Sequence, residues 1–314
     1  PVAGQTVSWS SSDATNPIVT VSGTGLVTAV GNGGPVTMTA TVGTKTGTAT
    51  VTVAQVVASV TITTQPGTPV QSGVTFTTVP VVTVKDALNN GVANQAVAVS
   101  VATGSALTFT NGTATTNASG VATFNGLSAT GVIGARTLRF TATVPSAPSN
   151  SVTLNAGAPA AVVISTQPAA TVQSGVVFSP VPVVTVTDGS GNLVPSQAVT
   201  VSVGSGSALA FTNGSATTDG SGVATFTGLS AVGLAGDRAL LLTSGTAGLS
   251  ASSTGTLSTG LPATVTINIQ AGSPVQSGVN FSTVPVVTVK DAGGNNVANQ
   301  AVTVSVATGT ALTF

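Results

Sequence analysis

The chain has 314 residues, a formal net charge of zero and only 4% charged residues, against ~25% in ordinary soluble proteins. Zero net charge with six basic residues excludes a basic patch for nucleic acid or for an anionic membrane surface. The absence of Cys and His excludes disulfides, thiolate nucleophiles and Ser-His-Asp catalysis.

The first predicted strands lie near the N-terminus and alternate apolar with polar residues. In the segment VTMTATV at 36–42, Val, Met, Ala and Val fall on one face and three Thr on the other. The segment TATVTV at 48–53 alternates in the same way. A period of two is typical of half-buried strands, and a chain without Glu and with few Lys lacks the best helix formers. The sequence therefore predicts an all-β fold.

From residue 56 onward the chain repeats itself. Residues 70–109 recur at 275–314 with 33 of 40 positions identical, and a looser copy lies at 172–211. The step of 102 to 103 residues is too long for a solenoid turn of ~20–50 residues, and it matches a small domain. We predict four units: a partial domain at 1–55, repeat 1 at 56–157, repeat 2 at 158–260 and an incomplete repeat 3 at 261–314. Both ends of the sequence fall inside units, so we interpret it as a segment of something longer.

Comparison of the copies separates the predicted core face from the solvent face. One strand carries alternating valines that are the same in every copy: Val97, Val99 and Val101; Val199, Val201 and Val203; Val302, Val304 and Val306. The interleaved residue varies, because Ala98 of repeat 1 is Thr in the others. We therefore expect the valines to face the core. The same comparison places Leu138 and Phe140 on an apolar face, and the charge of Arg139 serves nothing common to both repeats because repeat 2 has Leu there.

Turn signals separate the predicted strands at short intervals. The segment DALNNG at 86–91 joins two of them, and Asp side chains in such turns bond their own backbone. Its first residue is matched in each copy: Asp86, Asp188 and Asp291. Short alternating strands with frequent turns indicate a β-sandwich.

The junction Gly157-Ala158-Pro159 matches Gly260-Leu261-Pro262, and a short linker with Pro predicts a semi-rigid, elongated array.

Two stretches resemble known families. The run WSSSD at 9–13, with IVTV at 18–21 and GLVTAV at 25–30, looks like the second group of bacterial immunoglobulin-like domains. The run VTVKD at 82–86, with VAV at 97–99 and GVATF at 120–124, is similar to the first-group domains of intimin and invasin stalks. These resemblances imply tandem immunoglobulin-like β-sandwiches in an extracellular or cell-surface bacterial protein. Neither family carries a catalytic motif.

The charged residues do not assemble a recognisable site. We expect no catalytic, cofactor-binding or metal-binding residues. One carboxylate per turn is fewer than calcium usually needs, although a site built from backbone carbonyls stays open. Repeat 2 has no Lys, so a Lys–Asn crosslink through Lys85 and Lys290 cannot be general. Four Asn-X-Ser/Thr sequons are interpreted as turn residues, with glycan attachment as the alternative: Asn111, Asn117, Asn213 and Asn280.

The composition favours a structural role. With 4% charge, a free chain has little repulsion to keep it dispersed, which suits self-association in a filament or fibre. We therefore predict a non-enzymatic stalk or filament formed by homotypic packing. The alternative is an adhesin or glycan-binding module that displays loops to a surface glycan or matrix ligand. The chain has one Trp and no Tyr, which disfavours an aromatic binding platform. Nucleic acid is not an expected partner, and no segment is expected to span a membrane.

Overall fold

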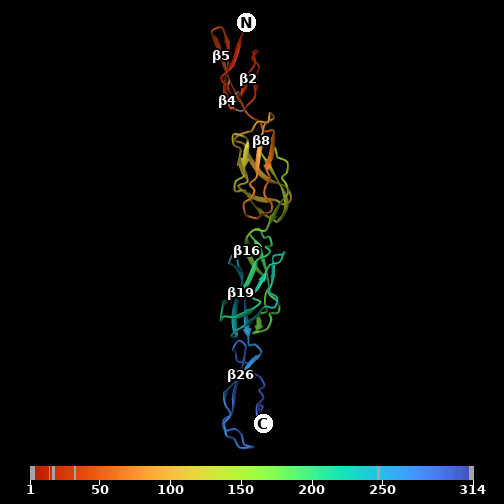
Figure 1. Ribbon diagram of the computed structural model, residues 1–314, viewed down its shortest axis with the longest axis vertical. Coiled ribbons are helices and arrows are strands. Elements are labelled where there is room, and N and C mark those ends of the chain that lie inside the picture. Colours follow the sequence, from red (N-terminus) through yellow and green to blue (C-terminus); the bar gives the residue numbers. More distant parts are fainter. Residues whose placement is uncertain (1–3, 14, 16–17, 32, 246–247, 311–314) are drawn as a thin grey trace. The chain divides into compact units, whose positions relative to one another are not determined.

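The computed structural model describes residues 4–13, 15, 18–31, 33–245 and 248–310 (Figure 1). In these residues the chain forms strands, turns and bends, and no helix, so the prediction of an all-β fold is confirmed. It follows that the described residues include no helix that could cross a membrane. The chain divides into two compact units, residues 1–157 and 158–314. The finer division into four units stays a prediction; we call them the N-terminal segment and repeats 1, 2 and 3.

The N-terminal segment forms a three-stranded antiparallel sheet and a hairpin. The sheet has the order β1 (Ser8–Ser11), β4 (Gly33–Val42), β5 (Lys45–Val53), and the hairpin joins β2 (Val19–Val21) to β3 (Val27–Ala29). The two predicted alternating strands therefore lie within β4 and β5. Val36 and Met38 of β4 pack with Val19 in a small core.

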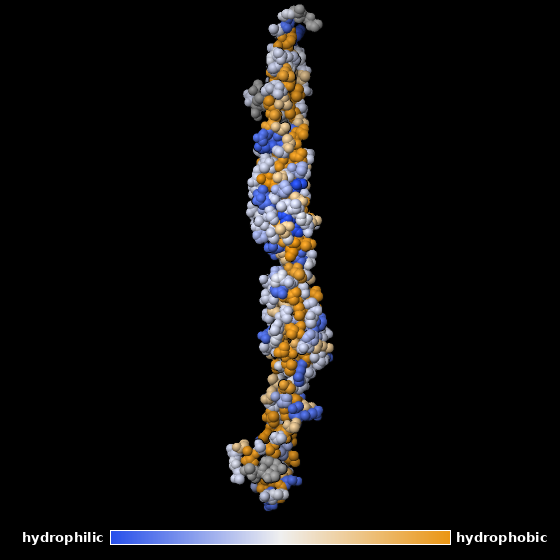
Figure 2. All heavy atoms as spheres, turned by 90° about the vertical axis from the view of Figure 1, so that its right-hand side faces the viewer, coloured by the Kyte–Doolittle hydropathy of each residue, from blue (hydrophilic) through white to orange (hydrophobic). Residues whose placement is uncertain are grey.

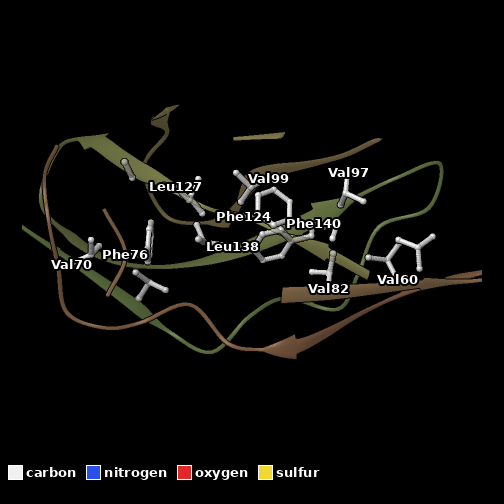
Figure 3. Packing of buried hydrophobic residues seen from close by; sticks show 14 of the residues in the cluster. Val60, Val70, Phe76, Val82, Val97, Val99, Phe124, Leu127, Leu138 and Phe140 are labelled. Carbon is white, nitrogen blue, oxygen red and sulfur yellow. The ribbon is translucent and has the colours of Figure 1, made fainter. Parts of the chain in front are cut away.

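Repeat 1 is a β-sandwich of two sheets. A five-stranded sheet has the order β11-β9-β14-β15-β7, a three-stranded sheet has the order β12-β8-β6, and β10 pairs with β13. The strands are β6 (Ser59–Thr64), β7 (Val70–Gln71), β8 (Val81–Lys85), β9 (Ala96–Thr103), β10 (Leu107–Thr110), β11 (Thr113–Thr115), β12 (Val121–Thr123), β13 (Ser128–Gly131), β14 (Gly134–Thr141) and β15 (Val152–Asn155). The core lies between the sheets, where Val82 of β8 faces Val97 and Val99 of β9 and Leu138 and Phe140 of β14 (Figure 3).

Repeat 2 has the same strand order. Its sheets run β21-β19-β24-β25-β17 and β16-β18-β22, and β20 pairs with β23. The strands are β16 (Pro159–Thr166), β17 (Thr171–Gln173), β18 (Val183–Asp188), β19 (Ala198–Ser205), β20 (Ala210–Thr212), β21 (Ser215–Thr217), β22 (Val223–Thr225), β23 (Ser230–Val232), β24 (Gly236–Ser244) and β25 (Leu249–Ser258). A step of 102 to 103 residues in sequence thus repeats one topology.

The predicted faces hold in the two complete repeats. Val97 and Val199 have no exposed surface, and Leu138 and Phe140 are fully buried. Ala98 is exposed, as expected for the varying position.

In repeat 3 the prediction of a core face is wrong. Val302 is 48% exposed and Val304 is 64% exposed. In repeat 1 the equivalent valines are covered by residues of β14 and of the opposite sheet. Within residues 261–310 only β26 (Pro262–Ile269) and β27 (Val286–Asp291) form, so no strand covers these positions.

Candidate functional site at the domain joints

Each repeat carries a hydrogen-bonded loop that we call the aspartate turn. These turns are residues 86–90, 188–192 and 291–295. In repeat 1, Oδ1 of Asp86 accepts hydrogen bonds from the backbone N–H of Leu88 at 2.9 Å and of Asn90 at 2.8 Å. Its Oδ2 accepts one from the Asn90 side chain at 3.2 Å. The other two aspartates hold their asparagines in the same way. The prediction that these aspartates are turn residues is confirmed.

In the second compact unit, the aspartate turn of repeat 3 binds the end of repeat 2. Oδ2 of Asp291 accepts a hydrogen bond of 2.7 Å from the backbone N–H of Gly260, the last residue of repeat 2. A Cβ at position 260 would lie 2.5 Å from the carbonyl oxygen of Ser174, so glycine is required there. Asp291 is only 3% exposed. Its charge is therefore held by hydrogen bonds rather than by water.

Asn295 extends this contact into the body of repeat 2. Its Nδ2 donates to the carbonyl oxygen of Gly233 at 2.8 Å, and its Oδ1 accepts from the backbone N–H of Ala235 at 2.7 Å. The same Nδ2 donates to Oδ2 of Asp291 at 2.8 Å. One side-chain amide thus links the turn of repeat 3 to a loop of repeat 2. We call residues 233–236 the receiving loop.

A buried arginine holds the receiving loop. Arg238 is 7% exposed, and its Nη2 donates to the carbonyl oxygen of Leu234 while Nη1 donates to that of Asp237 at 2.8 Å. Its Nε has no hydrogen-bond partner among the described residues. The guanidinium stays charged because it cannot lose its proton. The carbonyl oxygens of the loop accept its hydrogen bonds in place of the carboxylate of an ion pair.

Repeat 1 has the same device. Arg136 is 3% exposed and donates to three carbonyl oxygens, those of Ser105 at 3.1 Å, Gly134 at 2.9 Å and Val132. Both arginines occupy inward-facing positions of their strands, in line with buried residues such as Leu138 and Leu240. Sequence reasoning missed them. The signal was present, since arginine recurs 102 residues apart at a position where the pattern calls for an apolar residue.

Hydrogen bonds set the charge state of the turn aspartates. Burial alone would raise the pKa of Asp291, but hydrogen bonds from Asn295 and from Gly260 outweigh it and lower the pKa below the usual value. The pKa of Asp86 is lowered by the same balance, with burial opposed by donors from Asn90 and Gln55. Burial lowers the pKa of Arg136. Both aspartates are therefore anionic near neutral pH.

The other groups considered from sequence do not converge on one place. Asn111 and Asn213 donate their Nδ2 to the carbonyl oxygens of Gly126 and Gly228, as turn residues do. The Nζ of Lys85 contacts Oδ1 of Asn89 at 3.0 Å. In the described part of the chain, no three His, Cys, Asp or Glu residues lie close enough to hold a metal ion.

The joint is thus an assembly of mutually bonded groups. Asp291 and Asn295 both engage protein donors and acceptors across the boundary between repeats 2 and 3. Such a site can fix one domain against the next. It offers no activated nucleophile and no general base poised near neutral pH.

No family model and no curated protein matches the chain. Solved structures match it distantly. The Yersinia pseudotuberculosis adhesin InvE is 17% identical over 64% of this chain and 60% of that chain, with a TM-score of 0.28. Domains 4–9 of the surface layer protein SbsC are 19% identical over 94% of this chain and 46% of that chain, with a TM-score of 0.24. Invasin, a bacterial integrin-binding protein, is 19% identical over 86% of this chain and 56% of that chain, with a TM-score of 0.34. The chain spans less than two thirds of each, and at these scores its function must be argued from its own residues.

Proposed function

We propose that the chain is a non-enzymatic segment of an extracellular bacterial repeat protein, which forms a stalk or filament. The observation that carries this proposal is the joint between repeats 2 and 3. There, Asp291 and Asn295 make three hydrogen bonds across the boundary. Sequential domains joined by a flexible tether need no such contacts. Contacts of this kind suit a protein whose task is to hold its domains at a fixed spacing.

The surface supports homotypic packing between copies. Apolar side chains lie at the surface of both compact units, and few charged groups interrupt them (Figure 2). Val163 on β16 is 57% exposed and Val132 of repeat 1 is 58% exposed. A surface with few charges and with exposed apolar residues favours association over dispersion. The partner proposed for this surface is another copy of the chain, in a filament or fibre.

An adhesin or glycan-binding module is the second candidate. Such modules display aromatic side chains to their ligands. Here Phe76, Phe124, Phe140, Phe178 and Phe226 are each at most 4% exposed, so they belong to the two cores. Trp9 is 37% exposed. The other described aromatic side chains are buried or partly buried Phe rings. This distribution of aromatic side chains disfavours an adhesin or glycan-binding module relative to a stalk or filament.

Sedimentation and electron microscopy test the proposal. The chain is examined across a dilution series through the micromolar range, and the same samples are imaged. Filaments, or concentration-dependent lateral and end-to-end association, are expected. A monomer that stays unassociated at every concentration would exclude the filament. Binding of the monomer to a glycan array would then favour the adhesin reading.

A further inference from the structure

The aspartate turns of repeats 1 and 3 differ at two positions, Leu88 against Gly293 and Asn89 against Gly294, and only the first of these faces the preceding segment. The second residue after the aspartate is Leu88 in repeat 1 and Gly293 in repeat 3. The aspartate and its asparagine are the same in both, as Asp86 with Asn90 and Asp291 with Asn295. Each turn lies next to a preceding segment inside its own compact unit. The two joints can therefore be compared directly.

Gly293 lies against the receiving loop with no room for a side chain. A Cβ at this position would come within 2.2 Å of the carbonyl oxygen of Gly233 and 2.8 Å of its carbonyl carbon. These are backbone atoms, which cannot swing aside as the end of a flexible side chain can. Gly293 is not among the residues with positive φ. Contact with repeat 2, rather than backbone conformation, is therefore what demands glycine.

The joint in front of repeat 1 is open by comparison. A cavity of about 180 Å³ is lined by Ala29 and Val30 of the N-terminal segment and by Leu88 and Asn90 of the turn. Leu88 is 66% exposed. Among the described residues, the side-chain amide of Asn90 donates to Asp86, and no hydrogen bond links it to the N-terminal segment.

The residue that leads into each repeat also makes a weaker contact at the joint of repeat 1 than at the joint of repeat 3. Gln55 stands where repeat 2 ends in Gly260. Its Nε2 donates to Oδ2 of Asp86 at 3.2 Å, against 2.7 Å for the backbone N–H of Gly260 to Asp291. The Oε1 of Gln55 is buried without a hydrogen-bond partner. A side-chain contact thus replaces a shorter backbone contact.

We propose that the side chain two residues after the turn aspartate decides whether an aspartate turn can dock on the receiving loop. Glycine permits the locked joint of repeat 3, and a side chain of leucine size is incompatible with it. The receiving loop is then a docking surface for glycine-type aspartate turns. Repeats become non-interchangeable along the array, because a leucine-type turn placed after repeat 2 leaves an open, mobile joint. This inference stands on the two joints and does not depend on the proposed function.

Spin-label distance distributions across the joint, measured on the full chain, test the proposal. The chain has no Cys, so the pair Ser252→Cys and Thr266→Cys reports the joint of repeat 3. The pair Thr48→Cys and Thr61→Cys reports the joint of repeat 1. All four positions are exposed. The test variant is Gly293→Leu, and the matched control is Gly294→Asn, which introduces the residue that repeat 1 has at this position. Gly294 has φ of +85° and nothing within 4 Å of an added Cβ, and Asn89 in the turn of repeat 1 adopts φ of 71°, so Asn at position 294 fits the turn without touching repeat 2.

The wild-type distribution is expected to be narrow at the joint of repeat 3 and broad at the joint of repeat 1. Gly293→Leu is expected to broaden the former to the width of the latter, while Gly294→Asn leaves it narrow. Amide exchange at Ala235, which donates to Asn295, is expected to quicken by about tenfold or more in Gly293→Leu. Continued protection of the amide of Thr288, which is paired with Thr266, shows that β26 and β27 remain paired. Equal widths at both wild-type joints, an unchanged distribution in Gly293→Leu, or equal broadening in Gly294→Asn would overturn the proposal.

Discussion

The ring of Phe124 meets the ring of Phe140 edge-on, with centroids 4.8 Å apart and planes inclined at 63°. Phe124 follows β12 in the three-stranded sheet, and Phe140 belongs to β14 in the five-stranded sheet. The contact therefore crosses the sandwich at the centre of the core (Figure 3). Repeat 2 retains the first ring as Phe226 and has Leu242 in place of the second. The core thus accepts a branched aliphatic side chain where repeat 1 has an aromatic one.

Phe140→Ala should destabilise repeat 1 by about 3–5 kcal/mol, since it removes a fully buried ring and leaves a cavity. Phe140→Leu should cost less than about 1.5 kcal/mol, because repeat 2 already packs Leu at this position. Chemical denaturation of the full chain, with the transition of repeat 1 resolved from that of repeat 2, measures both. Equal losses in the two variants would contradict the equivalence of the two cores.

Val99→Asp should be far more damaging than Ala98→Thr. Val99 is 9% exposed on the inward face of β9, and burying an unpaired carboxylate costs several kcal/mol. Ala98 is exposed, and repeats 2 and 3 carry Thr there. Thermal unfolding of the two variants provides the comparison. Similar melting temperatures would show that the faces of β9 are assigned wrongly.

The arginine that holds a loop, Arg136, should matter more for stability than Arg139, three residues further along the same strand. Arg136→Gln leaves buried carbonyl oxygens without donors, at a cost of about 1–3 kcal/mol. Arg139→Leu should change stability by less than about 0.5 kcal/mol, because repeat 2 has Leu241 at that position. Denaturant midpoints of the two variants decide the matter. A larger loss in Arg139→Leu would refute the loop-holding role.

The sequence predicts those features that depend on local patterns and on comparison of copies. The alternation at 36–42 and the fixed valines at 97 and 99 identify strands and faces, because a buried position tolerates few residue types. The aspartate turns follow from the side chain's habit of bonding its own backbone. These features need no knowledge of distant contacts.

The joints could not be predicted in this way. The bond from Asn295 to Gly233 links residues of different repeats, and no pattern within either repeat announces it. The exposure of Val302 could not be predicted either. The residues around Val302 match those around a core valine of repeat 1, but its burial depends on strands that pack over it, and residues 261–310 supply none. The sequence shows that Leu88 of repeat 1 corresponds to Gly293 of repeat 3. The consequence of this difference for the joint follows only from the contact between Gly293 and the receiving loop.

Acid should open the joint between repeats 2 and 3. The folded pKa of Asp291 lies below its unfolded value, because hydrogen bonds to the carboxylate outweigh burial. Its contribution to stability is therefore complete above the unfolded pKa of about 3.9 and is lost as pH falls through the lower folded pKa. The groups that bond its carboxylate are neutral, namely Gly260, Gly293 and Asn295, so no neighbouring charge titrates with it through these contacts. Opening should appear as faster exchange of the Ala235 amide below about pH 4, after correction for the intrinsic pH dependence of exchange.

Asp291→Asn supplies the matched control for this acid effect. The variant keeps the shape of the side chain but carries no titrating group, so its joint should be weaker at pH 7 and lack the additional loss below pH ~4. Asp219→Asn serves as a second control, because repeat 1 already has Asn117 in that exposed turn. It should leave the acid profile of Ala235 exchange unchanged. If the wild type and Asp291→Asn show the same corrected profile between pH 2 and pH 7, Asp291 is not the group that couples the joint to pH.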